Sequence, residues 1–180
     1  MLKVASFDIV FQEIPGEVTL ALNLSNCPCH CPGCHSQHLA EDIGEPLTEE
    51  LLGGLIDRYG AMITCVAFMG GDAEPEEVAR LAEWVKGVRV TGYGLRTAWY
   101  SGRPALPESL TAKRSYSDNG LTVITVLQRS GLPYDFVKLG PYIESLGGLK
   151  SPTTNQRFYK RTPDGWVDDT ARFQKSTFPE

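Results

Sequence analysis

Residues 17–38 read EVTLALNLSNCPCHCPGCHSQH, and they join a predicted strand to a loop rich in cysteine. From Glu17 to Leu24, apolar or β-branched residues alternate with small and polar ones, which is the pattern of a β-strand. The loop that follows holds four of the five cysteines, namely Cys27, Cys29, Cys31 and Cys34. The strand therefore leads the chain into a segment where several thiols can meet.

The segments after this loop alternate between helix and strand patterns. Apolar residues at helical spacing predict helices over Thr48–Arg58 and Glu74–Lys86. The run Ile63–Met69 is almost entirely apolar and ends at two glycines, as expected for a buried parallel strand. Further strands are predicted at Val88–Val90, Leu95–Tyr100 and Asp135–Leu139. This alternation predicts an α/β fold with a parallel sheet.

Two stretches depart from the alternation and contain turn signals. The sequence Asp118-Asn119-Gly120 predicts a hairpin between Lys113–Ser117 and Leu121–Leu127. The sequence around Pro163-Asp164-Gly165 predicts a second hairpin over Gln156–Asp168. No repeat, low-complexity tract or linker is evident, so residues 1–180 are expected to form a single domain.

The composition limits the classes of function. A chain of 180 residues with 42% hydrophobic residues fits one globular domain with a substantial core. The net charge of −5 and the lack of a basic run argue against direct binding of nucleic acid. Residues 1–15 lack a signal-peptide pattern, and no stretch approaches the roughly 20 apolar residues of a membrane span. We therefore expect a cytoplasmic protein, in which crowded cysteines indicate metal or redox chemistry.

The cysteine loop is compatible with three kinds of site. Pro28 and Pro32 oppose a helix and Gly33 permits a tight turn, so thiolates can converge. A structural zinc site usually takes its four ligands from two separated pairs, which this loop lacks. A thiol redox motif explains Cys31 and Cys34 and leaves the two earlier cysteines without a role. The third kind of site is an iron–sulfur cluster.

The C-x3-C-x2-C spacing of Cys27, Cys31 and Cys34 suits three irons of a four-iron cluster, with the fourth iron open to a small molecule. This spacing resembles the signature of the radical S-adenosylmethionine superfamily. We favour the cluster, with zinc as an open alternative. Cys29 is then a bystander in the loop, and no primary role is assigned to the three histidines His30, His35 and His38.

A second feature lies at the end of the apolar strand, where the sequence reads Phe68-Met69-Gly70-Gly71-Asp72. Ligands of parallel sheets collect beyond the carboxyl ends of the strands, so this segment and the cysteine loop should share one face. An ordinary strand-to-helix turn capped by Asp72 would produce the same sequence. The segment nevertheless resembles the Gly-Gly-Glu motif with which the superfamily holds the amino group of S-adenosylmethionine, although Asp72 is one methylene shorter.

Four further segments are similar to the activating proteins of anaerobic (class III) ribonucleotide reductase. They are Cys31-Pro32-Gly33-Cys34-His35, Ala98-Trp99-Tyr100-Ser101-Gly102, the strand and turn at residues 135–142, and Thr154-Asn155-Gln156-Arg157. Each is ordinary turn or capping chemistry when taken alone. Their order, over residues 11–159, is what carries the resemblance; only 103–131 has no counterpart in it.

The resemblance implies an incomplete TIM-like β/α barrel with parallel strands, in which the cysteine loop follows the first core strand. A complete barrel takes about 250 residues, so this chain suits an open one that admits a large substrate. The implied cofactors are a 4Fe-4S cluster on Cys27, Cys31 and Cys34, and S-adenosylmethionine. The residues implied to bind the latter are Gly70, Gly71, Asp72, Ser101 and Gly102.

The implied activity is that of a glycyl-radical-enzyme activase, an oxidoreductase. The cluster and S-adenosylmethionine generate a 5′-deoxyadenosyl radical, which installs a glycyl radical on the partner protein. The implied partners are the large subunit of anaerobic ribonucleotide reductase and an electron donor such as flavodoxin. Two alternatives stay open: another radical S-adenosylmethionine enzyme, with a different activase target or a small-molecule substrate, and a non-catalytic zinc-binding interaction module.

Overall fold

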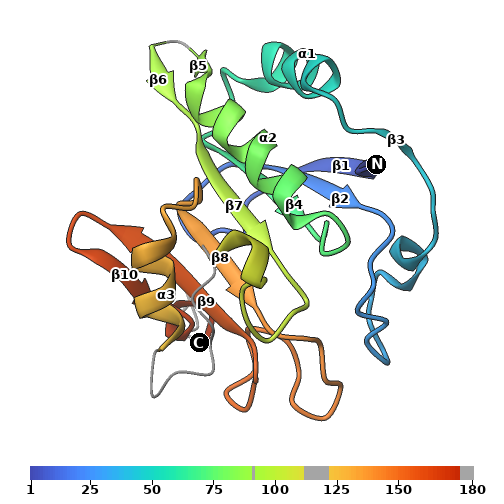
Figure 1. Ribbon diagram of the computed structural model, residues 1–180, viewed down its shortest axis with the longest axis vertical. Coiled ribbons are helices and arrows are strands. Elements are labelled where there is room, and N and C mark those ends of the chain that lie inside the picture. Colours follow the sequence, from blue (N-terminus) through green and yellow to red (C-terminus); the bar gives the residue numbers. More distant parts are fainter. Residues whose placement is uncertain (91, 112–121, 175–180) are drawn as a thin grey trace, which may run out of the picture.

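Four apolar segments form the parallel centre of an eight-stranded sheet in the computed structural model (Figure 1). The structure describes residues 1–90, 92–111 and 122–174. The central strands are β2 (Thr19–Leu24), β4 (Cys65–Met69), β7 (Arg96–Tyr100) and β8 (Phe136–Leu139). They pair in the order β8-β7-β4-β2, and every one of these pairings is parallel. The predicted α/β class and these four strands are confirmed.

Antiparallel strands extend the sheet at both edges. On one side, β1 (Lys3–Val10) pairs with β2 and with the short β3 (Glu45–Pro46). On the other side, β9 (Arg157–Thr162) pairs with β8, and β10 (Gly165–Asp168) pairs with β9. The hairpin predicted over residues 156–168 is thereby confirmed, whereas β1 was not predicted. Within the described residues, β3 and β10 are the unpaired ends of the sheet, so these residues form no closed barrel.

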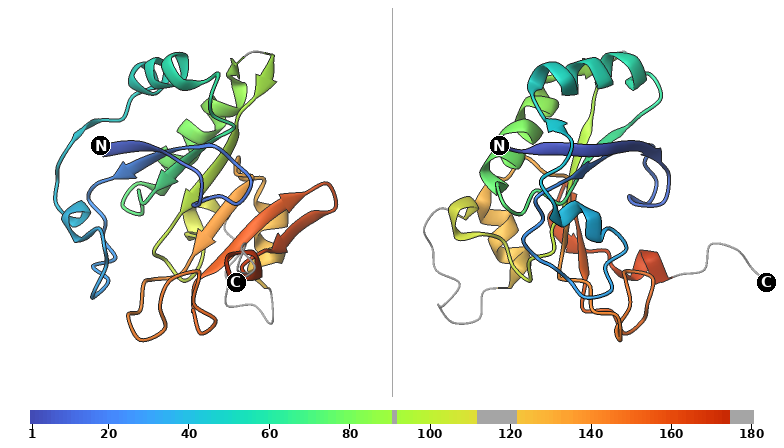
Figure 2. Two further views of the ribbon diagram at one scale, coloured as in Figure 1. Left: turned by 180° about the vertical axis from the view of Figure 1, so that it is seen from behind. Right: turned by 90° about the vertical axis from the view of Figure 1, so that its right-hand side faces the viewer.

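The two predicted helices are confirmed and differ from the prediction by one residue at each end. Helix α1 (Glu49–Tyr59) begins after Thr48, whose side chain accepts a hydrogen bond from the Leu51 amide. Helix α2 (Pro75–Gly87) begins with proline, which suits a first turn whose amide hydrogens have no partner within the helix. In Figure 1, α2 and α3 (Val123–Ser130) lie in front of the sheet, and the strands are seen from their other face in the left view of Figure 2.

Short elements complete the chain. They are η1 (Gln37–Ala40), η2 (Glu108–Leu110), α4 (Ala171–Gln174), and a two-stranded sheet of β5 (Arg89–Val90) and β6 (Tyr93–Gly94). The strand predicted at 88–90 is confirmed as β5, which pairs with β6 outside the main sheet. No helix among the described residues has the length and apolar character needed to cross a membrane.

The hairpin predicted between residues 113 and 127 is wrong in its second half. Residues 123–130 form helix α3, because Val123, Ile124 and Leu127 lie on one helical face and pack against the core. Thr122 caps the helix at its start, and Gly131 ends it in the left-handed conformation with φ of 63°. The first half of that hairpin and its turn, residues 113–120, lie outside the described residues.

Two cores lie on opposite faces of the sheet. The larger contains Val66 and Phe68 of β4 and the buried side of α2. The smaller contains Ile14, Cys65, Ala67, Ala98, Phe136 and Phe158. Alternate β4 residues therefore face different cores, as the period of a strand requires. The fifth cysteine, Cys65, is fully buried in the smaller core.

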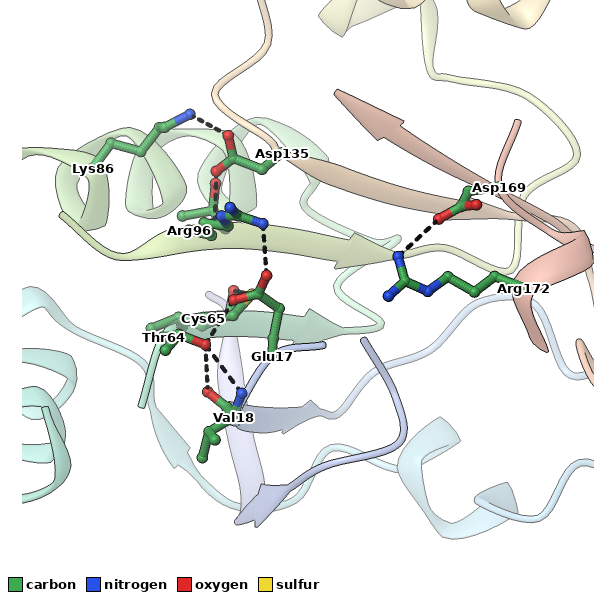
Figure 3. Close-up of polar contacts among 11 residues, drawn as sticks. Glu17, Val18, Thr64, Cys65, Lys86, Arg96, Asp135, Asp169 and Arg172 are labelled. Atoms are coloured by element: carbon green, nitrogen blue, oxygen red, sulfur yellow. Dashed lines mark hydrogen bonds and ion pairs between the residues drawn. The ribbon is translucent and has the colours of Figure 1, made fainter. Parts of the chain in front are cut away.

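Polar contacts join the amino ends of the parallel strands (Figure 3). The Arg96 guanidinium lies 2.6 Å from the carboxylate of Glu17. The Thr64 hydroxyl donates to the same carboxylate and accepts from the Val18 amide. These contacts link β2, β4 and β7 at the end opposite to the cysteine loop. The carboxyl ends are consequently held in register, and it is there that the candidate site lies.

Candidate metal centre

The carboxyl ends of β2, β4, β7 and β8 surround a cavity of about 420 Å³. The cysteine loop follows β2, and the glycine segment follows β4, as the strand order predicts. The side chains and glycines that line the cavity include all four loop cysteines together with Gly70, Asp72, Ser101, Gly102 and Lys138. Of the residues predicted to bind the cluster and its ligand, only Gly71 does not line this cavity.

Backbone hydrogen bonds fix both ends of the cysteine loop. The amide of Cys27 donates to the carbonyl of Leu39 at 2.9 Å, and the Cys34 amide donates to the Cys31 carbonyl at 3.2 Å. The backbone has positive φ at Asn26, His30 and Gly33, which are 59°, 43° and 72° respectively. Such residues reverse the chain tightly, so the loop folds back on itself and turns its thiols inward.

Cys27, Cys31 and Cys34 also border a second cavity, of about 250 Å³. Cys29 does not border it. Three thiols that surround common space, with thiolate as the ligand form, match the donor chemistry of an iron–sulfur cluster. The residues present therefore fit a cluster held by the three predicted cysteines.

The Cys29 thiol lies beside both Asp72 and Cys27. Its Sγ lies 3.8 Å from Oδ2 of that carboxylate, and Cys27 Sγ completes a group of three ligand atoms within 4.8 Å of one another. Burial, followed by the negative charge of Asp72, raises the pKa of Cys29 to about 12. Cys29 therefore stays a protonated thiol at neutral pH, which is the weaker ligand form.

The two glycines after β4 have different surroundings. Gly70 lines the cavity with φ of 99°, and its carbonyl accepts a hydrogen bond from Trp99 Nε1 at 2.8 Å. Gly71 instead faces the core, because a Cβ on this residue would lie 2.5 Å from a methyl group of Val78 and 2.9 Å from one of Leu24. The second glycine is required for close packing at the start of α2 rather than for access to the cavity.

Asp72 fixes the segment that follows β7. Its side chain is 1% exposed; one carboxylate oxygen accepts from the Ser101 hydroxyl and the other from the Gly102 amide at 3.0 Å. Arg103 donates to the Asp72 carbonyl at 2.9 Å and places its Nε 3.8 Å from the carboxylate. The predicted binding residues Asp72, Ser101 and Gly102 are thus joined in one network, which sequence spacing alone did not indicate.

Gly102 and Cys29 fit against each other at this rim. A Cβ on Gly102 would lie 2.6 Å from Cys29 Sγ, which is far inside van der Waals contact. The absence of a side chain at 102 therefore makes room for the Cys29 thiol beside Asp72. This contact gives Cys29 a packing role that the sequence did not reveal.

The segment Thr154–Arg157 orders the chain at the far wall of the cavity. Asn155 Nδ2 donates to the Pro141 carbonyl at 3.0 Å, and Gln156 lines the cavity and donates to the Gly140 carbonyl at 3.5 Å. Arg157 donates to the Thr154 carbonyl at 2.8 Å. The segment therefore braces the turn after β8.

The fold and this donor set define a metal-binding α/β protein. The family described as a 4Fe-4S single cluster domain matches residues 15–116, which is more than half of the chain. The protein belongs to that family, and the match includes the whole cysteine loop, the glycine segment and the Ser101–Arg103 segment. Comparisons with curated proteins and with solved structures gave no match.

Proposed function

We propose that this iron–sulfur protein is a radical S-adenosylmethionine enzyme that installs a glycyl radical on the large subunit of anaerobic ribonucleotide reductase. The observation that carries the proposal is that a C-x3-C-x2-C loop and a glycine-bearing strand end line one cavity. Family membership supports the cluster itself. The segments at residues 98–102, 135–142 and 154–157 resemble those of the activases and follow one another in the same order along the chain. This resemblance supports the choice of partner.

In this proposal, Cys27, Cys31 and Cys34 hold the cluster, and S-adenosylmethionine occupies the remaining space of the cavity. When bound, the two cofactors supply a 5′-deoxyadenosyl radical, which removes a hydrogen atom from a glycine of the partner. Gly70 leaves room for the ligand at the strand end. The Asp72 carboxylate has lone pairs beyond the two that Ser101 and Gly102 use, so it can anchor the rim and also accept from an ammonium group.

The open sheet supports a protein substrate. The described strands leave the sheet unclosed between β3 and β10. A glycine-bearing loop of a partner could reach the carboxyl ends of the strands from the open side, whereas a closed barrel would restrict access to the ends. An electron donor such as flavodoxin would supply the single electron that the reaction consumes.

The test combines the anaerobically reconstituted protein with S-adenosylmethionine, reduced flavodoxin and the reductase large subunit. We expect a glycyl-radical signal in electron paramagnetic resonance and stoichiometric 5′-deoxyadenosine. The Cys31→Ala variant should give neither product, and the matched Cys29→Ala variant should give both. Formation of 5′-deoxyadenosine without a radical on the reductase would reject this partner and favour another radical enzyme of the superfamily.

A zinc-binding module is the second candidate, and one observation favours it. The thiols of Cys27 and Cys29 and the carboxylate of Asp72 lie close enough to share one ion. A colourless protein with stoichiometric zinc, from which Cys29→Ala removes the metal, would support this candidate against the enzyme. The four ligands of a structural zinc site would then need one further donor.

A further inference from the structure

Lys138 is a buried cation to which the proposed function assigns no role in holding the cluster or S-adenosylmethionine. It lies in β8 between Val137 and Leu139, and it is 8% exposed. Its Nζ donates to the carbonyls of Gly140 at 2.6 Å and Ser101 at 3.3 Å. An ammonium group has three donors, so two carbonyls leave one unused.

No carboxylate forms an ion pair with Lys138 among residues 1–90, 92–111 and 122–174. Taking an ammonium group out of water is costly unless an anion compensates it. Asp72 acts on Lys138 as a negative charge, and so do the loop cysteines Cys31, Cys29 and Cys34 in their thiolate forms. Asp72 is hydrogen-bonded to Ser101 and Gly102 and makes no direct ion pair with Lys138. The Lys138 ammonium is therefore available to a group that occupies the cavity.

The position of Lys138 follows from the strand register. Lys138 shares a face of β8 with Phe136, which belongs to the smaller core, so its side chain lies on the side of the sheet opposite to α2. It is near the carboxyl end of the strand, and it lines the same cavity as the four cysteines. A lysine at this point puts a fixed positive charge beside the site of the cluster.

We propose that Lys138 is the counter-charge of the iron–sulfur cluster and raises its reduction potential. Three thiolates and an electron from an external one-electron donor add negative charge to the cavity, and a buried ammonium favours the state with more negative charge. Net charge and hydrogen bonds near the sulfurs are the main determinants of cluster potential. The proposal rests on the 4Fe-4S family of the chain, and it stands whether or not S-adenosylmethionine is the ligand.

The experiment is a potentiometric titration of the reconstituted protein, followed by electron paramagnetic resonance of the reduced cluster without added ligand. Lys138→Met and Lys138→Gln remove the charge, and Lys138→Arg keeps it. The control is Lys160→Met, which makes the same change in charge on β9 next to Phe136, at the amino end of β8. Iron content and circular dichroism are measured for every variant.

We expect both neutral variants to have a lower midpoint potential than the wild type. The reduced-to-oxidised ratio at a fixed potential should fall about tenfold, which is 59 mV for a one-electron couple. Lys138→Arg and Lys160→Met should stay within about a third of that shift. If folded neutral variants load no iron while Lys138→Arg does, the counter-charge role is also supported. Equal potentials in all loaded variants, or loss of the apoprotein fold in both neutral variants, would overturn it.

Discussion

Replacing Ser101 with alanine removes the hydroxyl that donates to the buried carboxylate of Asp72. A hydrogen bond to a charged group contributes about 1.5–3 kcal/mol, and Asp72 is 1% exposed, so water does not replace the lost donor. The Arg103 amide also loses its acceptor, Ser101 Oγ, at 3.0 Å. We therefore expect Ser101→Ala to lower the free energy of unfolding by about 2–3 kcal/mol.

The assay is urea denaturation of the apoprotein, followed by circular dichroism. Ser130→Ala is a matched control, because the Ser130 hydroxyl donates to a neutral carbonyl, that of Leu127, at 3.0 Å. Its loss should cost about 0.5–1.5 kcal/mol. Adding Asp72→Asn completes a double-mutant cycle, in which we expect the two changes to be coupled by more than about 0.5 kcal/mol. A cost for Ser101→Ala no larger than that of the control, with an additive cycle, would refute the anchoring role of Asp72.

Three further predictions concern packing and charge around the cavity. Gly71→Ala should destabilise the apoprotein by about 1–3 kcal/mol in urea, because its Cβ would overlap Val78 at a φ of 79°; an unchanged midpoint would refute the packing assignment. Gly102→Ala should reduce iron loading on reconstitution, and adding Cys29→Ala should restore part of it, since the clash is with Cys29 Sγ; equal loading in the single and double variants would contradict that. In the apoprotein, burial lowers the pKa of Lys138 from 10.5 to about 8. The buried charge therefore destabilises the folded protein fully below pH 8, and this destabilisation is lost as the pH rises to 10.5. Unfolding free energy relative to Lys138→Met should therefore rise by about 3 kcal/mol across that window, and a flat difference would argue against a buried ammonium.

The sequence predicted the parts of the fold that local patterns specify. The strand that leads into the cysteine loop and the apolar strand before Gly70 both formed where their sequence patterns predicted them. Strand β1 was not predicted, although its polar residues Ser6 and Asp8 alternate with apolar ones as in a half-buried strand; its register shifts between Val4 and Ser6. Helix α3 was taken for a strand because its β-branched residues favour strands when their helical spacing is ignored.

The sequence predicted where the candidate site lies, but it predicted few of the contacts between the residues of the site. Parallel strand ends meet at one edge, so the cysteine loop and Gly70 were expected to lie together. The contact between Asp72 and Ser101 joins residues 29 positions apart, and no local pattern encodes it. The sequence also contained an indication of Lys138 that the prediction did not use, because this lysine is the single charged residue in an apolar strand. A buried cation implies an anionic partner.

The central claim is that Cys27, Cys31 and Cys34 hold a four-iron cluster with one iron open to S-adenosylmethionine. Its most direct test is electron paramagnetic resonance of the anaerobically reconstituted, dithionite-reduced protein, with and without S-adenosylmethionine. We predict a reduced four-iron signal that changes when S-adenosylmethionine is added, disappears in Cys31→Ala and persists in Cys29→Ala. A signal that S-adenosylmethionine leaves unchanged, or a colourless protein that holds stoichiometric zinc, would contradict this account.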